Sequence, residues 1–204
     1  MPLSLVDGRE SGRNILGIVG SPRRNGNTDI LVNKILEGAR SASAVTDLIH
    51  LDEMEIMQCD GCHRCWGEGN CRWKDDMLSI YEKIAGCDVL VLGTPLYWFG
   101  PSAMMKACLD RFVYFNGPHT RPMVKGKVVI LAIPFEDTDL ETADPLVAMF
   151  ERSLAYLEME LFAMLLVPGV TRRGEVKERQ EQMDLAFEVG RAAVSDPRRS
   201  DPLS

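Results

Sequence analysis

The chain has 204 residues, of which 46% are hydrophobic and 26% are charged, and its net charge is −7. A chain of this length and composition buries roughly 70% of the surface that its unfolded form exposes, so we expect a hydrophobic core that needs no disulfide or metal for support. The acidic balance argues against binding to nucleic acid, whose phosphates require a basic surface. No apolar run reaches the ~20 residues of a membrane-spanning helix, and residues 1–13 lack the apolar stretch of a signal peptide. We therefore expect a cytoplasmic protein with neither nucleic acid nor a membrane as partner.

Strand and helix patterns alternate along the chain. Continuous apolar runs, which are typical of strands buried on both faces, predict strands at residues 15–20, 87–93, 127–134 and 161–167, and a mixed run predicts a peripheral strand at residues 45–51. Hydrophobic residues at helical spacing predict helices at residues 28–39, 75–84, from Pro101 onward, around 147–157 and at 175–194.

This alternation predicts an α/β fold with a doubly wound sheet and right-handed crossovers. Five strands favour a flavodoxin-like parallel sheet of order 2-1-3-4-5 with helices on both faces, which binds its ligand at the carboxyl ends of the first and third strands. We expect a single domain at residues 14–194, with a cysteine-rich loop at 57–74. Residues 1–13 are predicted to form an extension and residues 195–204 a disordered tail.

A loop rich in turn-forming residues, 21–28, connects the first strand to the first helix. A helix N-terminus offers unpaired backbone N–H groups and a positive dipole, which suit an anion. The loop lacks the glycine patterns of dinucleotide sites and of nucleotide triphosphatases, so a flavin monophosphate suits it better. An ordinary turn with a helix N-cap is the alternative.

Three consecutive aromatic residues, Tyr97, Trp98 and Phe99, follow the third strand between Pro95 and Gly100. An isoalloxazine ring needs a flat apolar surface and main-chain groups at its polar edge, and this loop supplies both. The alternative is that these aromatic side chains cover the core or pack against a second subunit.

Four of the six cysteines follow the spacing C-x₂-C-x₂-C-x₅-C, at Cys59, Cys62, Cys65 and Cys71. Two-residue gaps in a glycine-containing loop turn successive thiolates toward one centre, and four soft ligands suit a [4Fe–4S] cluster. A structural zinc ribbon separates its two cysteine pairs by ~15–20 residues, so zinc fits less well. Redox thiols without metal remain the main competitor.

Other polar and sulfur-containing residues are given structural roles. His63, inside the cysteine segment, is predicted to be a solvated loop residue, and Cys87 and Cys108 to be small core residues. Lys106 and the Asp110–Arg111 pair, one helical turn apart, are predicted to form a surface ion pair that orders their helix.

The motifs at residues 20–28, 59–71, 75–77 and 94–100, followed by Lys106 and Asp110-Arg111, together resemble the NADPH-dependent FMN reductase superfamily, and within it most closely the iron–sulfur flavoproteins. The resemblance spans about residues 15–170. It implies non-covalent FMN on a flavodoxin-like fold, with its phosphate surrounded by Ser21, Arg23, Asn27 and Thr28 and its ring bordered by Pro95, Leu96, Tyr97, Trp98, Phe99 and Gly100. It also implies that the four clustered cysteines are cluster ligands. The chain departs from the family at residues 133–137, which are bulky and acidic where relatives often carry small residues.

From these observations we expect an FMN-dependent oxidoreductase. Electrons would pass between a reduced nicotinamide, NAD(P)H, or another donor, FMN and a [4Fe–4S] cluster, and then to a redox partner protein or a small-molecule acceptor. Cofactor chemistry of this kind requires no protein acid, base or nucleophile, so no catalytic residue is predicted. The resemblance further implies a homodimer or homotetramer in which one subunit's cluster approaches another's flavin. The alternatives are a cluster-free NAD(P)H:FMN or quinone reductase and a non-enzymatic flavodoxin-like electron carrier.

Overall fold

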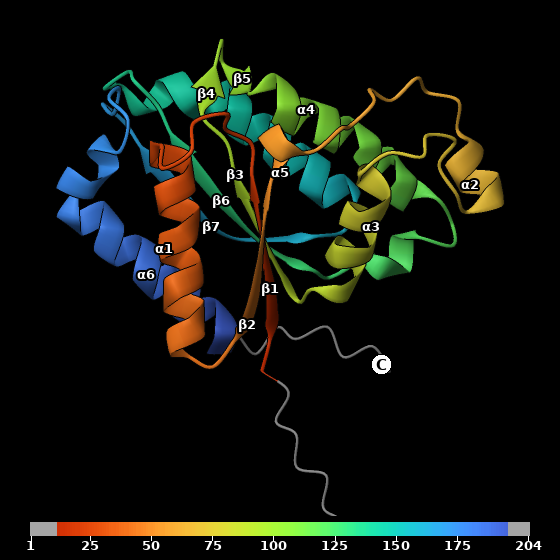
Figure 1. Ribbon diagram of the computed structural model, residues 1–204, viewed down its shortest axis with the longest axis horizontal. Helices are drawn as coiled ribbons and strands as arrows, with labels where there is room; N and C mark the ends of the chain where they lie inside the picture. Colours follow the sequence, from red (N-terminus) through yellow and green to blue (C-terminus); the bar gives the residue numbers. More distant parts are fainter. Residues whose placement is uncertain (1–11, 196–204) are drawn as a thin grey trace, which may run out of the picture.

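A five-stranded parallel sheet forms the centre of the computed structural model, which describes residues 12–195 (Figure 1). The sheet strands are β1 (Asn14–Val19), β2 (Val45–His50), β3 (Val89–Gly93), β6 (Val128–Pro134) and β7 (Glu160–Val167). Their spatial order is β2-β1-β3-β6-β7, and all neighbouring pairs are parallel. Counted along the chain, these strands have the predicted order 2-1-3-4-5, so the predicted fold class is confirmed. Most of the predicted extension and tail, residues 1–11 and 196–204, lies outside the described residues.

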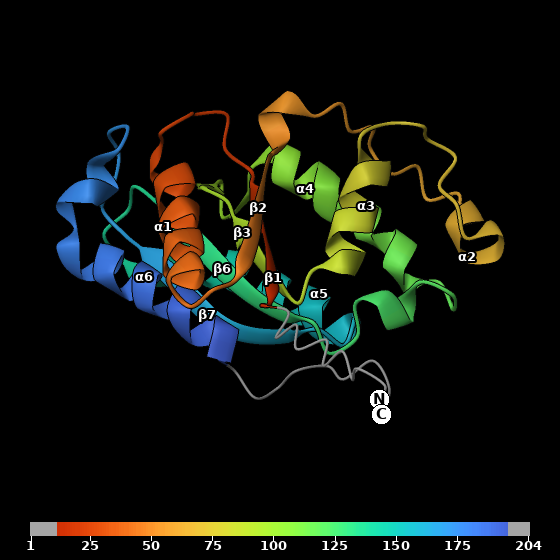
Figure 2. The same ribbon diagram turned by 60° about the horizontal axis from the view of Figure 1, so that its bottom comes forward.

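Helices cover both faces of the sheet (Figure 2). One face carries α1 (Asn27–Ser41) and α6 (Gln180–Ser195). The other carries α3 (Met77–Gly86), α4 (Ala103–Asp110) and α5 (Asp144–Tyr156), while the short α2 (Arg64–Glu68) lies at the far end of the molecule in the cysteine-rich loop. Short 3₁₀ helices complete the connections: η1 (Leu51–Glu53), η2 (Arg111–Asn116), η3 (Arg121–Met123), η4 (Leu140–Ala143) and η5 (Glu175–Glu178).

The side chains of the central strands alternate between the two faces. In β1, Leu16 and Ile18 pack in the core beneath α3, α4 and α5, whereas Ile15 and Val19 pack beneath α1 and α6. Both faces of the strand are therefore buried, and this explains why its sequence is a continuous apolar run instead of an alternating one.

The crossing of α1 and α6 depends on two glycines. A Cβ added at Gly38 would lie 1.9 Å from the Phe187 carbonyl oxygen, and a Cβ at Gly190 would lie 1.9 Å from the Ile35 carbonyl oxygen. The two helices thus touch backbone to backbone, which no larger residue at these positions permits without a shift.

Two helix boundaries differ from the sequence prediction. Pro101 does not open a helix but pairs with Leu96 in a small hairpin formed by β4 (Leu96–Tyr97) and β5 (Gly100–Pro101). The helix begins at Ala103 because the Ser102 hydroxyl accepts a hydrogen bond from the Met105 N–H. The last helix begins at Gln180 instead of residue 175, because Arg179 leaves the helical conformation. None of the helices in residues 12–195 is long and apolar enough to cross a membrane.

Candidate functional site

The loops after four of the sheet strands surround one cavity at the carboxyl edge of the sheet. The cavity is lined by Ser21, Arg23, Asn27, Thr28, Pro95, Leu96, Tyr97, Pro134, Phe135, Glu136, Val170 and Thr171. The first seven of these were predicted to surround a flavin, and they come from two loops about 70 residues apart in the sequence. The parallel topology therefore brings both predicted loops to one place, as expected at a switch point of a doubly wound sheet. Their contact with a flavin stays a prediction.

Asp29, in the first turn of α1, organises the loop at residues 21–28. Asn25 has a left-handed backbone (φ 55°), and its N–H donates to the Asp29 carboxylate at 2.7 Å. The same carboxylate accepts from the Asn33 amide at 2.7 Å and lies 3.0 Å from the His50 Nε2 at the end of β2. Sequence reasoning missed this role, although an acidic residue just inside a helix start is a signal for it.

Asn27 connects this loop to the segment that follows β7. Its side-chain amide donates to the Arg172 carbonyl at 3.0 Å, and its side-chain oxygen accepts from the Val176 N–H at 3.1 Å. The bonds fix the segment that supplies Val170 and Thr171 to the cavity. Sequence reasoning missed these two residues as well, although they come directly after a strand that ends at the ligand-binding edge.

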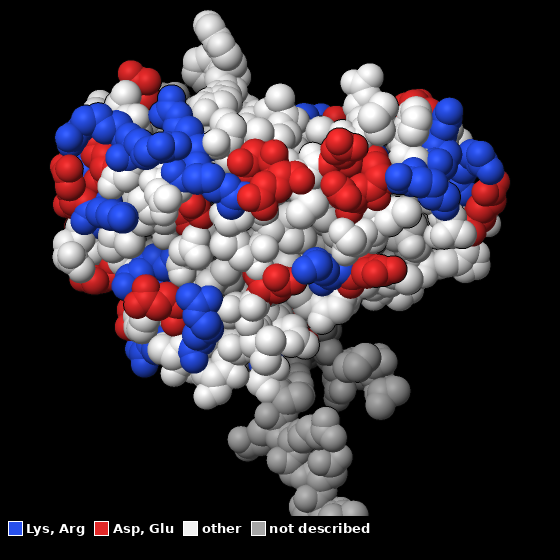
Figure 3. Space-filling model, in the orientation of Figure 1, with Lys and Arg blue, Asp and Glu red and all other residues white. Residues whose placement is uncertain are grey.

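The two neighbouring arginines of the loop point to different partners. Arg24 forms ion pairs with Glu53 and, at 3.5 Å, with Asp52, whereas Arg23 lines the cavity. Figure 3 shows basic side chains above the start of α1 and acidic side chains beside them. The donors directed to the cavity from this side are therefore Arg23 and the buried hydroxyl side chains of Ser21 and Thr28.

The β4–β5 hairpin places the three aromatic residues differently. Tyr97 lines the cavity, but Trp98 and Phe99 form the turn with left-handed backbones and are 95% and 56% exposed. The tip projects from the top of the molecule in Figures 1 and 3. Gly100 pairs with Tyr97 across the hairpin and, like the two turn residues, is not among the residues that line the cavity. The alternative in which these aromatic residues cover the core is wrong for Trp98 and Phe99.

The departure from the family at residues 133–137 faces the cavity. Pro134, Phe135 and Glu136 line it, with Phe135 buried in the core and Glu136 exposed at the rim. This wall therefore carries an acidic and a bulky apolar side chain.

All four clustered cysteines line a second cavity. Cys59, Cys62, Cys65 and Cys71 share its wall with Trp73, Tyr81 and Arg111. Burial and then the nearby Cys71 raise the pKa of the Cys65 thiol. Within residues 12–195, no group of three Cys, His, Asp or Glu side chains already stands as a set of metal ligands. The structure thus brings the four cysteines to the wall of one cavity.

The remaining sulfur and imidazole groups have the predicted structural roles. His63 is exposed, with a left-handed backbone, and its ring packs against Trp66 at a centroid distance of 4.2 Å. Cys87 and Cys108 are buried in the core. These three predictions are confirmed.

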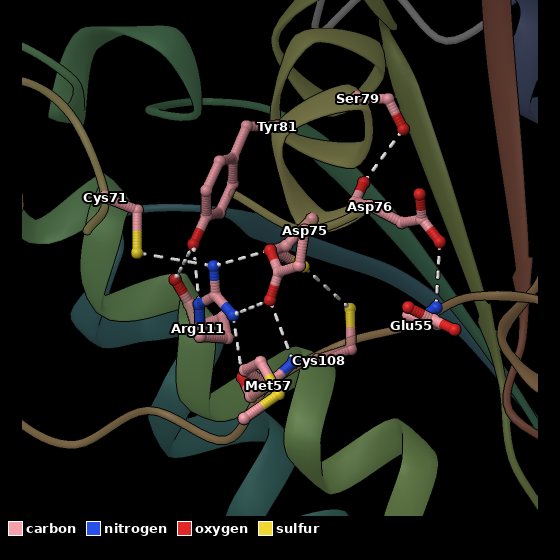
Figure 4. Close-up of polar contacts among 10 residues, drawn as sticks. Glu55, Met57, Cys71, Asp75, Asp76, Ser79, Tyr81, Cys108 and Arg111 are labelled. Carbon is pink, nitrogen blue, oxygen red and sulfur yellow. Dashed lines mark hydrogen bonds and ion pairs between the residues drawn. The ribbon is translucent and has the colours of Figure 1, made fainter. Parts of the chain in front are cut away.

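The two ends of the cysteine loop are held together where α3 begins (Figure 4). The Asp76 carboxylate accepts from the Glu55 N–H at 2.8 Å, and the Asp76 N–H donates to the Glu55 carbonyl at 3.2 Å. The Asp75 carboxylate accepts from the Met57 N–H at 2.8 Å. These contacts close the loop without any metal.

Arg111 lies at the centre of this closure, and the prediction that it belongs to a surface ion pair is wrong. Its side chain is 1% exposed and pairs with Asp75 through two nitrogens, Nη1 at 2.6 Å and Nη2 at 3.0 Å. Nη1 also donates to the Met57 carbonyl at 2.7 Å, and Nη2 to the Cys71 Sγ at 3.3 Å. The surface pair consists of Lys106 and Asp110 alone, at 2.5 Å. The reason is that α4 ends at Asp110, so that Arg111 begins η2 and is directed to the interior.

Burial and ion pairing act in opposite directions on these buried groups. Burial opposes the charge of Arg111, but its hydrogen bonds to Asp75 and Tyr81 outweigh that effect and hold its pKa above the ordinary value. Burial raises the pKa of Tyr81, whose hydroxyl donates to the Arg111 carbonyl at 3.0 Å. The wall of the cysteine cavity therefore carries a permanent positive charge and a neutral phenol.

The sequence and the fold of the chain are similar to those of known proteins. Residues 13–157 match the sequence profile of the family described as NADPH-dependent FMN reductase. An iron–sulfur flavoprotein of Methanocaldococcus jannaschii is 39% identical over 97 residues, which are 48% of this chain and 50% of that protein. The chain thus matches about half the length of this relative.

Two Bacillus subtilis proteins match over a larger share of their length. One is named as an NAD(P)H-dependent FMN-containing oxidoreductase and is 26% identical over 174 residues, 83% of this chain and 92% of that protein. The solved structure of a Trp repressor binding protein aligns with a TM-score of 0.67 and 25% identity, over 86% of this chain and 99% of the other. The profile match covers more than half of the chain and includes three of the four loops that surround the first cavity, and the chain therefore belongs to the NADPH-dependent FMN reductase family.

Proposed function

We propose that the chain is an FMN-dependent oxidoreductase that binds its flavin in the cavity at the carboxyl edge of the sheet. The observation that carries the proposal is that seven residues expected to bind FMN, from the loops after β1 and β3, line one cavity. The loop after β1 supplies hydroxyl groups and an arginine to it, and the loop after β3 supplies apolar and aromatic side chains. This division matches a ligand with a phosphate at one end and a flat ring at the other.

In this proposal the side chains position the cofactor. Ser21, Thr28 and Arg23 bind the phosphate next to the start of α1, where the helix dipole favours an anion. Pro95, Leu96 and Tyr97 form the wall against which the ring lies. Bound FMN supplies the electron-transfer chemistry, with NAD(P)H or another reduced donor as its source of electrons. We assign no protein acid or base.

We further propose that Cys59, Cys62, Cys65 and Cys71 hold a [4Fe–4S] cluster. Their four thiols line one cavity, and thiolates are the ligands that such clusters require. The name of the Methanocaldococcus jannaschii relative, which matches over about half its length, supports the same assignment. The cluster would exchange single electrons with a redox partner protein or a small-molecule acceptor. We also propose a homodimer or homotetramer, to which the exposed Trp98 and Phe99 side chains are suited.

Anaerobic purification with FMN and iron quantified per chain tests both assignments. We expect one FMN and four iron atoms per chain, with a broad absorption shoulder beneath the flavin bands. Cys62→Ser should remove the iron and keep the FMN, whereas Cys87→Ser, a control at a buried cysteine outside the cluster loop, should keep both. A colourless protein that takes up no added FMN would contradict the flavin site.

A cluster-free NAD(P)H:FMN or quinone reductase is the second candidate. It is favoured by the observation that, in the part of the chain that the structure describes, the cysteines are not already arranged as metal ligands. Flavin bands without iron, bleached rapidly by NADPH or NADH, would support it. Bleaching that requires a partner protein would instead indicate a non-enzymatic electron carrier.

A further inference from the structure

One residue in the wall of the cysteine cavity carries a buried N–H donor that is unpaired in the part of the chain that the structure describes. Trp73 lines this cavity, and its indole Nε1 is buried and has no hydrogen-bond partner within residues 12–195. Leaving such a donor unpaired in the interior is unfavourable, and native structures rarely do so. The unpaired indole therefore points to an acceptor that is bound in the cavity.

Arg111, the first residue of η2, supplies a second N–H donor to the cysteine cavity. A guanidinium has five N–H groups. Four are taken by oxygen atoms, namely the Tyr81 hydroxyl at 3.3 Å, the Met57 carbonyl and the two Asp75 carboxylate oxygens. The fifth is directed to the Cys71 sulfur. Because the guanidinium is planar and rigid, its four oxygen partners fix the direction of this last N–H.

We propose that Arg111, through the Cys71 Sγ, and Trp73 donate hydrogen bonds to sulfur atoms of the group formed with the four cysteines, their thiolates included, and thereby favour its reduced form. The inference rests on the proposed function, because it takes that group to be a [4Fe–4S] cluster. Reduction adds one electron and breaks no bond, and both N–H groups keep their protons. Donors to the sulfurs stabilise the added negative charge and raise the reduction potential. Neither residue is a metal ligand, and both act through hydrogen bonds to sulfur.

Trp73 also packs as an aromatic ring, and the test must separate this role from hydrogen bonding. The Arg72 guanidinium lies 4.7 Å from the centre of the Trp73 ring. Trp73→Phe keeps an aromatic ring for this contact and removes the N–H together with part of the indole ring, a loss of ring size that the control variant shares. Trp66→Phe is the matched control, because the Trp66 Nε1 in the same loop already donates to the Val113 carbonyl at 2.8 Å.

The experiment compares anaerobically reconstituted wild-type protein, W73F and W66F. FMN and iron are quantified, and the cluster potential is measured by a redox titration followed by electron paramagnetic resonance. W73F should retain FMN and iron and show a lower potential, and W66F should match the wild-type potential. Arg111→Lys keeps a positive charge for Asp75 but loses the planar guanidinium that binds Asp75 and Cys71 together. It should therefore also lower the potential.

Equal potentials in loaded W73F and wild-type protein would overturn the inference while the proposed function stands. A wild-type chain that binds FMN but no iron would overturn the cluster and this inference together, and would leave the flavin site unaffected. The two failures are therefore distinguishable.

A spectroscopic measurement keeps the inference testable if W73F does not fold. W66F protein carrying tryptophan labelled with ¹⁵N at the indole nitrogen is reduced and examined by pulsed electron paramagnetic resonance. A ¹⁵N coupling to the cluster spin is expected from Trp73, because the only other tryptophan left, Trp98, is exposed at the hairpin tip. The absence of any coupling in the loaded protein would overturn the inference.

Discussion

The Arg111 guanidinium and the Asp75 carboxylate form a two-point ion pair in the protein interior, where their side chains are only 1% and 7% exposed. The pair joins the end of α4 to the residues that precede α3. It also holds the backbone of Met57, which opens the cysteine loop. One buried contact therefore positions the loop relative to two helices of the core.

Removing one partner of this pair should destabilise the protein strongly. Asp75→Ala leaves the Arg111 charge buried and unpaired, and we expect the free energy of unfolding to fall by about 3–5 kcal/mol. Urea denaturation of the iron-free protein measures the change. Asp110→Ala breaks the exposed pair with Lys106 and should cost at most about 1 kcal/mol. A similar small loss for Asp75→Ala would mean that the buried pair does not stabilise the fold.

Acid should weaken the fold through the same carboxylate. Burial by itself raises the pKa of Asp75, but hydrogen bonds from Arg111 and from the Met57 N–H outweigh it and hold the pKa below its ordinary value. The stabilisation is then fully present above about pH 4, the pKa of an unfolded aspartate, and is lost as the pH falls through the lower value of the folded state. The free energy of unfolding, measured from pH 5 down to pH 2, should fall less steeply in Asp75→Asn. Identical acid slopes would exclude this carboxylate as the cause.

Two glycine substitutions should change the stability of the protein in opposite directions, because only one of the two glycines lies at the close contact between α1 and α6. Gly190→Ala places a Cβ 1.9 Å from the Ile35 carbonyl oxygen and should destabilise the protein by about 1–3 kcal/mol despite the better helix propensity of alanine. Gly86→Ala, at the end of α3, meets no atom within 4 Å and should stabilise it by up to about 1 kcal/mol. Thermal unfolding of both variants checks the pair. Equal melting temperatures would contradict the close crossing.

Arg23 and Arg24 should differ in their effect on the flavin phosphate. Arg23→Gln removes a charge from the cavity and should weaken FMN binding about 10- to 100-fold, the equivalent of one charge-assisted hydrogen bond. Riboflavin, which lacks the phosphate, should bind this variant and the wild-type protein equally. Arg24→Gln is the control, because Arg24 pairs with Asp52 and Glu53. Fluorescence titration of the flavin-free protein measures all affinities, and equal FMN affinities in the two variants would refute the assignment.

Thiol reactivity should divide the cysteines into two classes. Burial raises the pKa of Cys87 to about 11 and that of Cys108 to about 12, so both thiols stay protonated and shielded near neutral pH. In the iron-free folded protein at pH 7.5, iodoacetamide should label the exposed Cys62 and spare these two until the protein is unfolded. Peptide mass spectrometry identifies the labelled positions. Rapid labelling of Cys108 in the folded state would contradict its burial.

The fold could be predicted because its signals are local. The six apolar residues at 15–20 are by themselves enough to indicate a strand that is buried on both faces. Because parallel strands end at a common edge of the sheet, the loops at residues 21–28 and 94–100 are then expected to lie together. The burial of Arg111 and its pairing with Asp75 could not be predicted in this way. Its partner Asp75 lies 36 residues away, and the local pattern offered the nearby Lys106 and Asp110 as the simpler pairing. The contact of Gly38 with Phe187 likewise depends on how two distant helices cross.

The closed base of the cysteine loop has a consequence for substitutions inside the loop. Because Glu55 and Met57 are bonded to Asp76 and Asp75, the chain leaves the sheet layer and returns to it at nearly the same point. Between these anchors the loop touches the end of α4 and η2, because the Trp66 Nε1 donates to the Val113 carbonyl and Arg111 donates to the Cys71 Sγ, but none of its anchors lies on a sheet strand. A change at an exposed position of the loop, such as Cys62, should therefore leave the strand order and the cavity at the carboxyl edge of the sheet as they are.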